Sequence, residues 1–173
     1  VIAPDLQSEF PALRALDVFP NNLPTQLTSF VGREKEMLEV TQMLKQSRLL
    51  TLTGSGGTGK TRLSLQVASG ILEQFKDGVW FIELAPVSEP ALVPSTVANV
   101  LRLRVEDSRP LIDVVMDWLR DKEALFILDN CEHLIDACAQ FANTILQNCR
   151  GVRILASSRE ALGVAGEAAY RVP

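Results

Sequence analysis

One short stretch of this sequence, GSGGTGKT at residues 54–61, determines the fold. The apolar run LLTLT at residues 49–53 precedes it, and apolar residues spaced four apart follow it, at Leu63, Val67, Ile71 and Phe75. A short apolar run predicts a β-strand, whereas apolar residues four apart predict one face of an α-helix. The order strand, glycine-rich loop, helix, with the pattern G-x-x-x-x-G-K-[ST], is typical of a loop that binds phosphate.

The residue types in this loop explain why it would bind phosphate. Glycine lets the chain wrap tightly, so that backbone N–H groups and the start of the following helix converge on an anion. We expect Lys60 to bridge the β and γ phosphates and the Thr61 hydroxyl to ligate magnesium, with Arg62 as a weaker contact. The alternative is a glycine-rich turn with a solvated lysine. The expected nucleotide-binding residues here are Gly54, Gly56, Gly57, Thr58, Gly59, Lys60, Thr61 and Arg62.

Strands and helices alternate along the rest of the chain. Apolar runs predict strands at residues 79–85, 124–128, 152–156 and from residue 170, and the almost continuous run at 79–85 predicts a strand buried on both faces. Helical spacing predicts helices at residues 33–46, 89–101, from 108 and from 134 to 151. This alternation predicts a three-layer α/β domain with a parallel sheet. Together with the phosphate-binding loop it resembles a P-loop NTPase fold of the ASCE type, and this resemblance implies a five-stranded parallel sheet in the order 2-3-1-4-5. Ligands of such sheets bind at the carboxyl ends of the strands.

Asp129 follows the apolar run ALFIL at residues 124–128 and would stand at the tip of a buried strand. A carboxylate there can hold magnesium beside a hydroxyl, so we expect Thr61 and Asp129 to form the metal site. The alternative is that Asp129 caps the helix that follows, and the two roles can coexist.

The residue after Asp129 bears on hydrolysis. Many P-loop ATPases have an acid at this position, which acts on the attacking water, whereas this chain has Asn130. An amide orients water but does not accept its proton, so we expect slow hydrolysis unless Glu132 or His133 reaches the site. His133 is the only histidine, and we expect it to be a capping or surface residue.

Arg159 follows the fourth expected strand and is placed to reach the γ-phosphate of a nucleotide. It joins Lys60 and Asp129 as an expected catalytic residue. The alternative is a surface ion pair with Glu160 or Glu167. Guanine specificity is unsupported, because the sequence N-K-x-D does not occur.

Composition and charge exclude several classes of protein. The 173 residues are 47% hydrophobic and 22% charged, which excludes a disordered chain. The net charge of −4 argues against a basic surface for nucleic acid or anionic lipid. No membrane span or secretory leader is readable, so we expect a cytoplasmic protein. The three cysteines lack C-x-x-C spacing, and we expect them to be reduced and buried.

The first residues differ in character from the rest. Four of the nine prolines fall within the first 24 residues, where no periodic pattern is sustained. We interpret residues 1–28 as a linker or N-terminal extension, extended and partly docked, and residues 29–173 as one nucleotide-binding domain.

Four motifs in this order resemble those of the signal-transduction ATPases with numerous domains, the STAND class. Phe30-Val31-Gly32-Arg33 with Glu36 resembles the hhGRxxE motif, and it is followed by the loop at 54–61, LDNCEH at 128–133 and SSRE at 157–160. The class includes NB-ARC proteins and bacterial regulators of the AfsR and LuxR type, and the later motifs look most like the bacterial branch. The resemblance covers residues 21–173. Without it, residues 31–36 would be interpreted as a turn that leads into a helix.

This resemblance implies the ATP- and ADP-binding core of a multidomain transcriptional regulator. By it, Val31 and Arg33 would lie against adenine and ribose, and Arg159 would sense the γ-phosphate. It also implies partner domains in a longer polypeptide: winged-helix and helical-repeat parts beyond residue 173 and, because residues 10–24 are similar to a known connector, an N-terminal nucleotide cyclase domain. We expect no direct contact with nucleic acid or membrane, and a nucleotide-dependent oligomer.

Three functions remain open at the level of sequence. The leading hypothesis is a nucleotide-dependent switch that slow, magnesium-dependent ATP hydrolysis resets. A non-hydrolysing adenine nucleotide scaffold is the first alternative, favoured by Asn130. A small-molecule kinase is the second, in which a lid would contain Arg102, Arg104 and Arg109.

Overall fold

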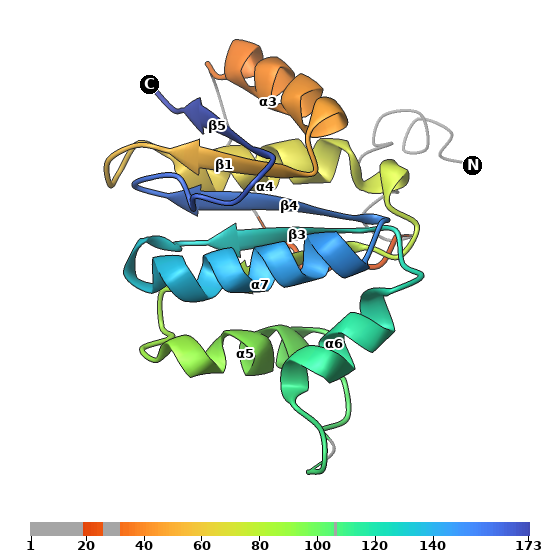
Figure 1. Cartoon of the computed structure of the whole chain (residues 1–173). Coiled ribbons are helices and arrows are strands. Elements are labelled where there is room, and N and C mark those ends of the chain that lie inside the picture. Colours follow the sequence, from red (N-terminus) through yellow and green to blue (C-terminus); the bar gives the residue numbers. More distant parts are fainter. Residues whose placement is uncertain (1–18, 26–31, 106) are drawn as a thin grey trace, which may run out of the picture.

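The computed structural model describes residues 19–25, 32–105 and 107–173, which form a parallel five-stranded sheet covered by helices (Figure 1). The strands are β1 (Leu49–Thr53), β2 (Val79–Glu83), β3 (Ala124–Asp129), β4 (Val152–Ser158) and β5 (Glu167–Arg171). The α-helices are α3 (Glu34–Gln46), α4 (Lys60–Gly70), α5 (Val93–Val100), α6 (Leu111–Leu119) and α7 (Ile135–Asn148). The predicted α/β class and parallel sheet are therefore confirmed.

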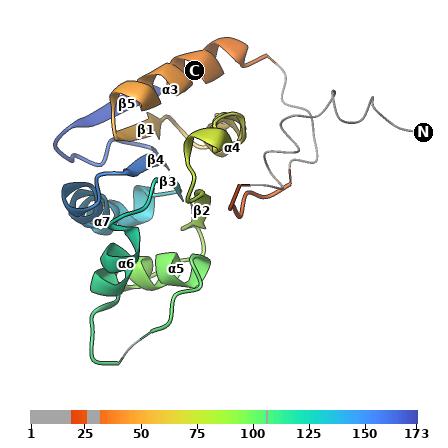
Figure 2. The same ribbon diagram turned by 90° about the vertical axis from the view of Figure 1, so that its right-hand side faces the viewer.

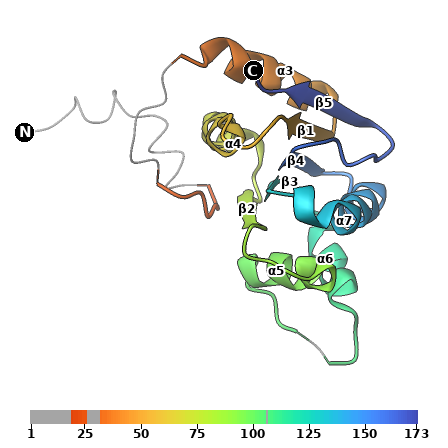
Figure 3. The same ribbon diagram turned by 90° about the vertical axis from the view of Figure 1, so that its left-hand side faces the viewer.

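The helices cover the two faces of the sheet in separate layers. One face carries α3 and α4, the other carries α5, α6 and α7, and Figures 2 and 3 show α4 and α7 on opposite sides of the strands. Residues of β3 alternate between these faces: Leu125 and Ile127 pack on the α3–α4 face, Phe126 and Leu128 on the α5–α7 face. A strand covered on both faces is apolar at every position, which explains the run ALFIL.

The strand order is β2-β3-β4-β1-β5, which corrects the predicted position of one strand. β4 pairs with both β3 and β1, so it separates the strand before the glycine-rich loop from the strand that ends at Asp129. The prediction placed β1 directly beside β3. Apolar periodicity identifies a buried strand but not its neighbours, so it could not distinguish the two orders.

β2 lies at the edge of the sheet. Its side chains nevertheless pack on both faces, as predicted: Val79 and Phe81 on the α3–α4 face and Trp80 and Ile82 on the α5–α7 face. Only Glu83, at its end, is exposed.

Residues 19–25 lie along the free edge of β2. Asn21 forms a parallel bridge with Val79, and the Asn22 side chain exchanges two hydrogen bonds with the backbone of Phe81. This part of the predicted linker is docked on the domain, and the remainder of it lies outside the described residues.

The ends of two helices differ from the predicted positions. α4 ends at Gly70, and a short 3-10 turn follows before Phe75, although the apolar spacing continues to that residue. α6 begins at Leu111 with Pro110 as its N-cap, so Ser108 is not the cap. Proline suits a helix start because the N–H that it lacks would have no helical partner there. No helix in the described part of the chain is both long and apolar enough to cross a bilayer.

Candidate functional site

The glycine-rich loop joins β1 to α4 at the carboxyl edge of the sheet, the edge where the parallel strands end. Gly54, Gly57 and Gly59 have φ angles of +147°, +82° and +85°, a region that favours glycine. A Cβ on Gly54 would lie 3.3 Å from both Thr58 Oγ1 and the carbonyl oxygen of Val172. Gly59 is the N-cap of α4, so the loop ends at the positive end of the helix dipole, where phosphate groups bind in many proteins.

Lys60 is the first residue of α4 and is folded into the loop. Its side chain is buried, and its ammonium group donates 2.8 Å hydrogen bonds to the carbonyl oxygens of Gly54 and Ser55. Thr58 Oγ1 donates to the Ser55 carbonyl at 3.0 Å, which closes the loop further. The alternative of a solvated lysine is therefore wrong.

Three side chains from three elements meet beside Lys60. Asp129 Oδ1 at the end of β3 accepts hydrogen bonds from Thr61 Oγ1 at 2.7 Å and from Ser157 Oγ at 2.8 Å. Ser157, near the end of β4, also accepts a 3.1 Å bond from the Asn130 N–H. We call Thr61, Asp129 and Ser157 the hydroxyl–carboxylate cluster. The structure brings Thr61 and Asp129 together and adds Ser157, which the sequence placed at the ligand-binding end of a strand without a specific chemical role.

The environment of Asp129 fits a magnesium ion rather than a helix cap. The short turn at residues 132–134 and α7 have no side-chain cap hydrogen bond, so the capping alternative is wrong. Magnesium takes one or two protein carboxylates or hydroxyls, keeps several waters and binds phosphate oxygens. Asp129 is 6% exposed and lies against hydroxyl oxygen at the N-terminus of α4, which matches that ligand preference.

The three residues expected to act on water lie just beyond β3. Asn130 has a φ angle of +67°, a conformation that asparagine adopts more readily than most residues. The turn with Glu132 and His133 packs through Leu134 into the α5–α7 face, which is opposite to α4. His133 is exposed, and its Nε2 lies 2.8 Å from the Val87 carbonyl oxygen, as fits a surface residue. Within the described residues, neither Glu132 nor His133 forms a hydrogen bond or an ion pair with the glycine-rich loop.

Arg159 lies over the glycine-rich loop just beyond β4. A Cβ built on Gly56 would be 3.8 Å from Arg159 Nη2. Within the described residues Arg159 forms no ion pair with Glu160 or Glu167. The Glu167 carboxylate instead accepts hydrogen bonds from the N–H groups of residues 162 and 163. The structure therefore favours the loop over the surface ion pair as the environment of this guanidinium.

Arg33 contacts the same loop from the residue before α3. Its Nη2 donates to the Thr58 carbonyl at 2.8 Å and to the Pro173 carbonyl at 3.3 Å. Its Nη1 is buried and has no hydrogen-bond partner within the described residues. Arg62 lies in the first turn of α4, whereas Val31 lies outside the described residues.

The cysteines do not belong to this site. All three are free and buried, as predicted, and they pack in the α5–α7 face. Burial raises the pKa of the Cys149 thiol, so it stays protonated and packs as a small apolar group.

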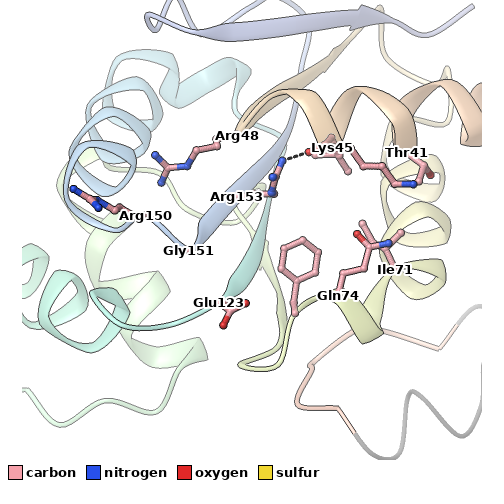
Figure 4. Close-up of a pocket in the computed structure, with 11 residues that line it drawn as sticks. Thr41, Lys45, Arg48, Ile71, Gln74, Glu123, Arg150, Gly151 and Arg153 are labelled. Atoms are coloured by element: carbon pink, nitrogen blue, oxygen red, sulfur yellow. Dashed lines mark hydrogen bonds between the residues drawn. The ribbon is translucent and has the colours of Figure 1, made fainter.

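A second concave region lies at the amino edge of the sheet, where the strands begin. It is a cavity of about 350 Å³, and Figure 4 shows the cationic side chains around it, Lys45, Arg48, Arg150 and Arg153. The Arg48 guanidinium binds the carbonyls of Leu146, Cys149 and Val152, and the Arg153 guanidinium binds those of Leu44 and Ser47. These two groups hold the last turns of α7 and α3, so the presence of Arg48 and Arg153 at the cavity has a structural reason.

The parallel sheet, the glycine-rich loop before α4 and the carboxylate at the end of β3 define a P-loop NTPase fold. The chain belongs to the AAA domain family, which matches it over residues 42–164. Membership of this family implies binding of a nucleotide and of Mg²⁺.

Two relatives from Mycobacterium tuberculosis are similar in sequence. Uncharacterized protein Rv0894 is 43% identical over 147 residues, which cover 85% of this chain and 37% of that protein. Putative HTH-type transcriptional regulator Rv0890c is 44% identical over 131 residues, which cover 76% of this chain and 15% of that protein. The chain therefore spans less than two fifths of the length of either relative.

Solved structures share the fold. A STAND protein with a tetratricopeptide repeat sensor, PH0952 from Pyrococcus horikoshii, superposes with a TM-score of 0.61 at 12% identity, over 87% of this chain and 24% of that one. The ORC2 protein of Aeropyrum pernix, in ADPNP and ADP complexes, gives a TM-score of 0.62 at 12% identity, over 87% of this chain and 50% of that one. At this identity the likeness concerns the fold alone.

Proposed function

We propose that this chain is the ATP- and ADP-binding core of a larger bacterial regulator of transcription, in which slow magnesium-dependent hydrolysis resets a nucleotide-dependent switch. The observation that carries the proposal is the hydroxyl–carboxylate cluster beside the buried Lys60. The relative with the HTH-type regulator name supports the larger context, because its matched part is a small share of a longer protein.

The loop and α4 would hold the phosphates. Lys60 would exchange its bonds to the Gly54 and Ser55 carbonyls for bonds to β and γ phosphate oxygens, which are stronger acceptors. Thr61 and Asp129 would hold the ion, with Ser157 fixing the orientation of the carboxylate. Bound there, Mg²⁺ neutralises charge on the phosphates.

Arg33 and Arg159 would respond to the nucleotide from the two sides of the loop. Arg159 extends over Gly56 and is placed to contact the γ-phosphate, which ATP has and ADP lacks. Arg33 and Val31 would lie toward the adenosine part, as the STAND resemblance implies. A difference of a few kcal/mol in affinity between two domain arrangements is enough to shift their populations.

Several parts of the proposal concern the whole protein. Residues 29–173 would form the nucleotide-binding domain, residues 1–28 the connector to an N-terminal domain such as a nucleotide cyclase, and winged-helix and helical-repeat parts would follow. We propose that the protein acts in the cytoplasm and forms a nucleotide-dependent oligomer. DNA contact would come from the other domains.

One residue, Asn130, supports the alternative of a non-hydrolysing scaffold. Asn130 occupies the position that follows the magnesium carboxylate and cannot accept a proton. The kinase alternative stays a hypothesis, and Arg109 of its expected lid pairs with Asp117 at 2.5 Å.

Calorimetric titration of ADP and ATP with Mg²⁺ into the wild type and Lys60→Ala tests the proposal. We expect affinity for both nucleotides to fall about 100-fold in Lys60→Ala, since each tenfold corresponds to about 1.4 kcal/mol. The control is Lys35→Ala, which removes an exposed lysine on α3 and should leave both affinities unchanged. Equal affinities in the wild type and Lys60→Ala would contradict the role of Lys60.

A further inference from the structure

Glu83, the last residue of β2, lies directly beside Asp129. β2 pairs with β3 in a register that sets Glu83 opposite Asp129, and the Leu84 N–H donates to the Asp129 carbonyl at 3.1 Å. Neighbouring strands lie about 4.8 Å apart. The end of β2 is also held from its other side, where Asn22 binds the backbone of Phe81. The position of Glu83 relative to Asp129 is therefore fixed by the backbone.

Glu83 and Asp129 point to the same face of the sheet. Successive side chains of a strand alternate between its faces. In β2, Val79 and Phe81 pack on the α3–α4 face, so Glu83, two residues further, belongs to that face. Asp129 belongs to it too, because its carboxylate binds Thr61 of α4. Glu83 thus stands on the loop side of the sheet, one strand beyond Asp129.

The other side chains near this edge that could accept a proton from water already accept hydrogen bonds, point elsewhere or are not basic. The Asp129 carboxylate binds two hydroxyl groups, and Asn130 carries an amide. Leu134 anchors the turn that carries Glu132 and His133 on the α5–α7 face, and the His133 ring lies against the Val87 carbonyl. Glu83 is exposed and, within the described residues, forms no side-chain hydrogen bond or ion pair. A free carboxylate on the nucleotide side is what deprotonation of an attacking water requires.

We propose that the Glu83 carboxylate is the general base for ATP hydrolysis in this domain, in place of the acid that Asn130 lacks. The assignment rests on the proposed function. Water oxygen forms a bond to the γ-phosphorus while the bond from that phosphorus to the β–γ bridging oxygen breaks, and ADP leaves with the electron pair. The water proton passes to the Glu83 carboxylate and then to solvent. The products are ADP, inorganic phosphate and one proton.

Glu83→Gln separates binding from hydrolysis. We measure phosphate release in a single turnover of Mg-ATP bound to the wild type and to Glu83→Gln, together with the ATP affinity of each. The phosphate release rate should fall about 100-fold in Glu83→Gln, since a general base contributes on the order of 10² or more. The affinity should stay within about threefold, because the amide keeps the size and the position of the side chain. The control Glu89→Gln makes the same change at an exposed residue beyond β2 and should match the wild type.

A crystal structure with Mg²⁺ and a non-hydrolysable ATP analogue provides a readout apart from turnover. It should show a water within hydrogen-bond distance of the Glu83 carboxylate and facing the γ-phosphorus.

Phosphate release from Glu83→Gln at the wild-type rate would overturn the assignment of Glu83 as the general base. The absence of phosphate release from wild type that holds ATP would overturn it as well. If Glu83→Gln releases phosphate at the wild-type rate while Lys60→Ala loses nucleotide affinity, the proposed function stands and only the role of Glu83 is overturned. No phosphate release from a wild type that holds ATP would also contradict the hydrolysis in the proposed function and would favour the non-hydrolysing scaffold. A wild type that binds no ATP would contradict both proposals.

Discussion

The two edges of the sheet hold cations in opposite electrostatic settings: half-buried arginines at the amino edge and the buried Lys60 at the carboxyl edge. At the amino edge, Arg48 and Arg153 bind backbone carbonyls in and after the last turns of α7 and α3. The C-terminal end of a helix carries partial negative charge, so a cation there is stabilised twice, by hydrogen bonds and by the dipole. At the carboxyl edge, Lys60 also binds carbonyls, but it stands at the first residue of α4, where the helix carries partial positive charge.

This difference separates a structural edge from a binding edge. Burial lowers the pKa of Arg48 and the like charge of Arg153 lowers it further, yet guanidinium remains charged at any ordinary pH. The carbonyls of the helix ends compensate these two charges. Lys60 has no such compensation from its own helix, and an anion at the loop would improve its electrostatic environment. Substitutions at the amino edge should therefore change stability, and those at the carboxyl edge should change ligand binding.

Arg48→Met should have the largest effect on stability. It removes bonds to three backbone carbonyls and leaves partly buried acceptors unpaired, so we expect the free energy of unfolding to fall by about 2 kcal/mol. Urea denaturation measures this change, and calorimetry should show nucleotide affinity within about twofold of the wild type. Arg150→Met, at an exposed arginine of the same cavity, is the control and should cost less than about 0.5 kcal/mol. Loss of nucleotide affinity in folded Arg48→Met would contradict the claim that the amino edge affects stability and not ligand binding.

Thr61→Ala, at the carboxyl edge, should weaken nucleotide binding that depends on Mg²⁺. It removes one expected ligand of Mg²⁺, so affinity for ADP should fall about tenfold when Mg²⁺ is present, which corresponds to about 1.4 kcal/mol. With EDTA in place of Mg²⁺, Thr61→Ala and wild type should bind ADP equally. Thr61→Ser keeps the hydroxyl and serves as the control. Equal losses with and without the metal would show that Thr61 acts on the loop conformation rather than on the ion.

The sequence predicted the parts of this edge that are encoded locally. The loop between β1 and α4 is one continuous pattern, and three of its four glycines, Gly54, Gly57 and Gly59, have positive φ angles. The meeting of Thr61 and Asp129 followed from a general rule, that parallel strands end at one edge.

The parts that depend on strand pairing could not be predicted. The position of β4, the edge position of β2 and the bond from Ser157 to Asp129 follow from contacts between segments remote in sequence. Apolar periodicity reports burial, and it contains no information about which strand lies beside which. Glu83 was missed for the same reason, because only the register shows that it lies beside Asp129. A serine or glutamate at the end of an apolar run is the one local signal that could have directed attention to them.

A pair of glycines gives the smallest and sharpest test of the comparison. Gly57, in the loop, and Gly163, outside it, both have a φ angle of +82°, and a Cβ on either would meet nothing within 4 Å. Gly57→Ala and Gly163→Ala should therefore incur the same backbone strain, about 1 kcal/mol, which is partly offset because alanine restricts the unfolded chain. Only Gly57→Ala should weaken nucleotide binding, because strain there competes with the loop conformation that holds phosphate. Denaturation curves should thus nearly coincide for the two variants while calorimetry separates them, and equal affinities would mean that the loop conformation does not limit binding.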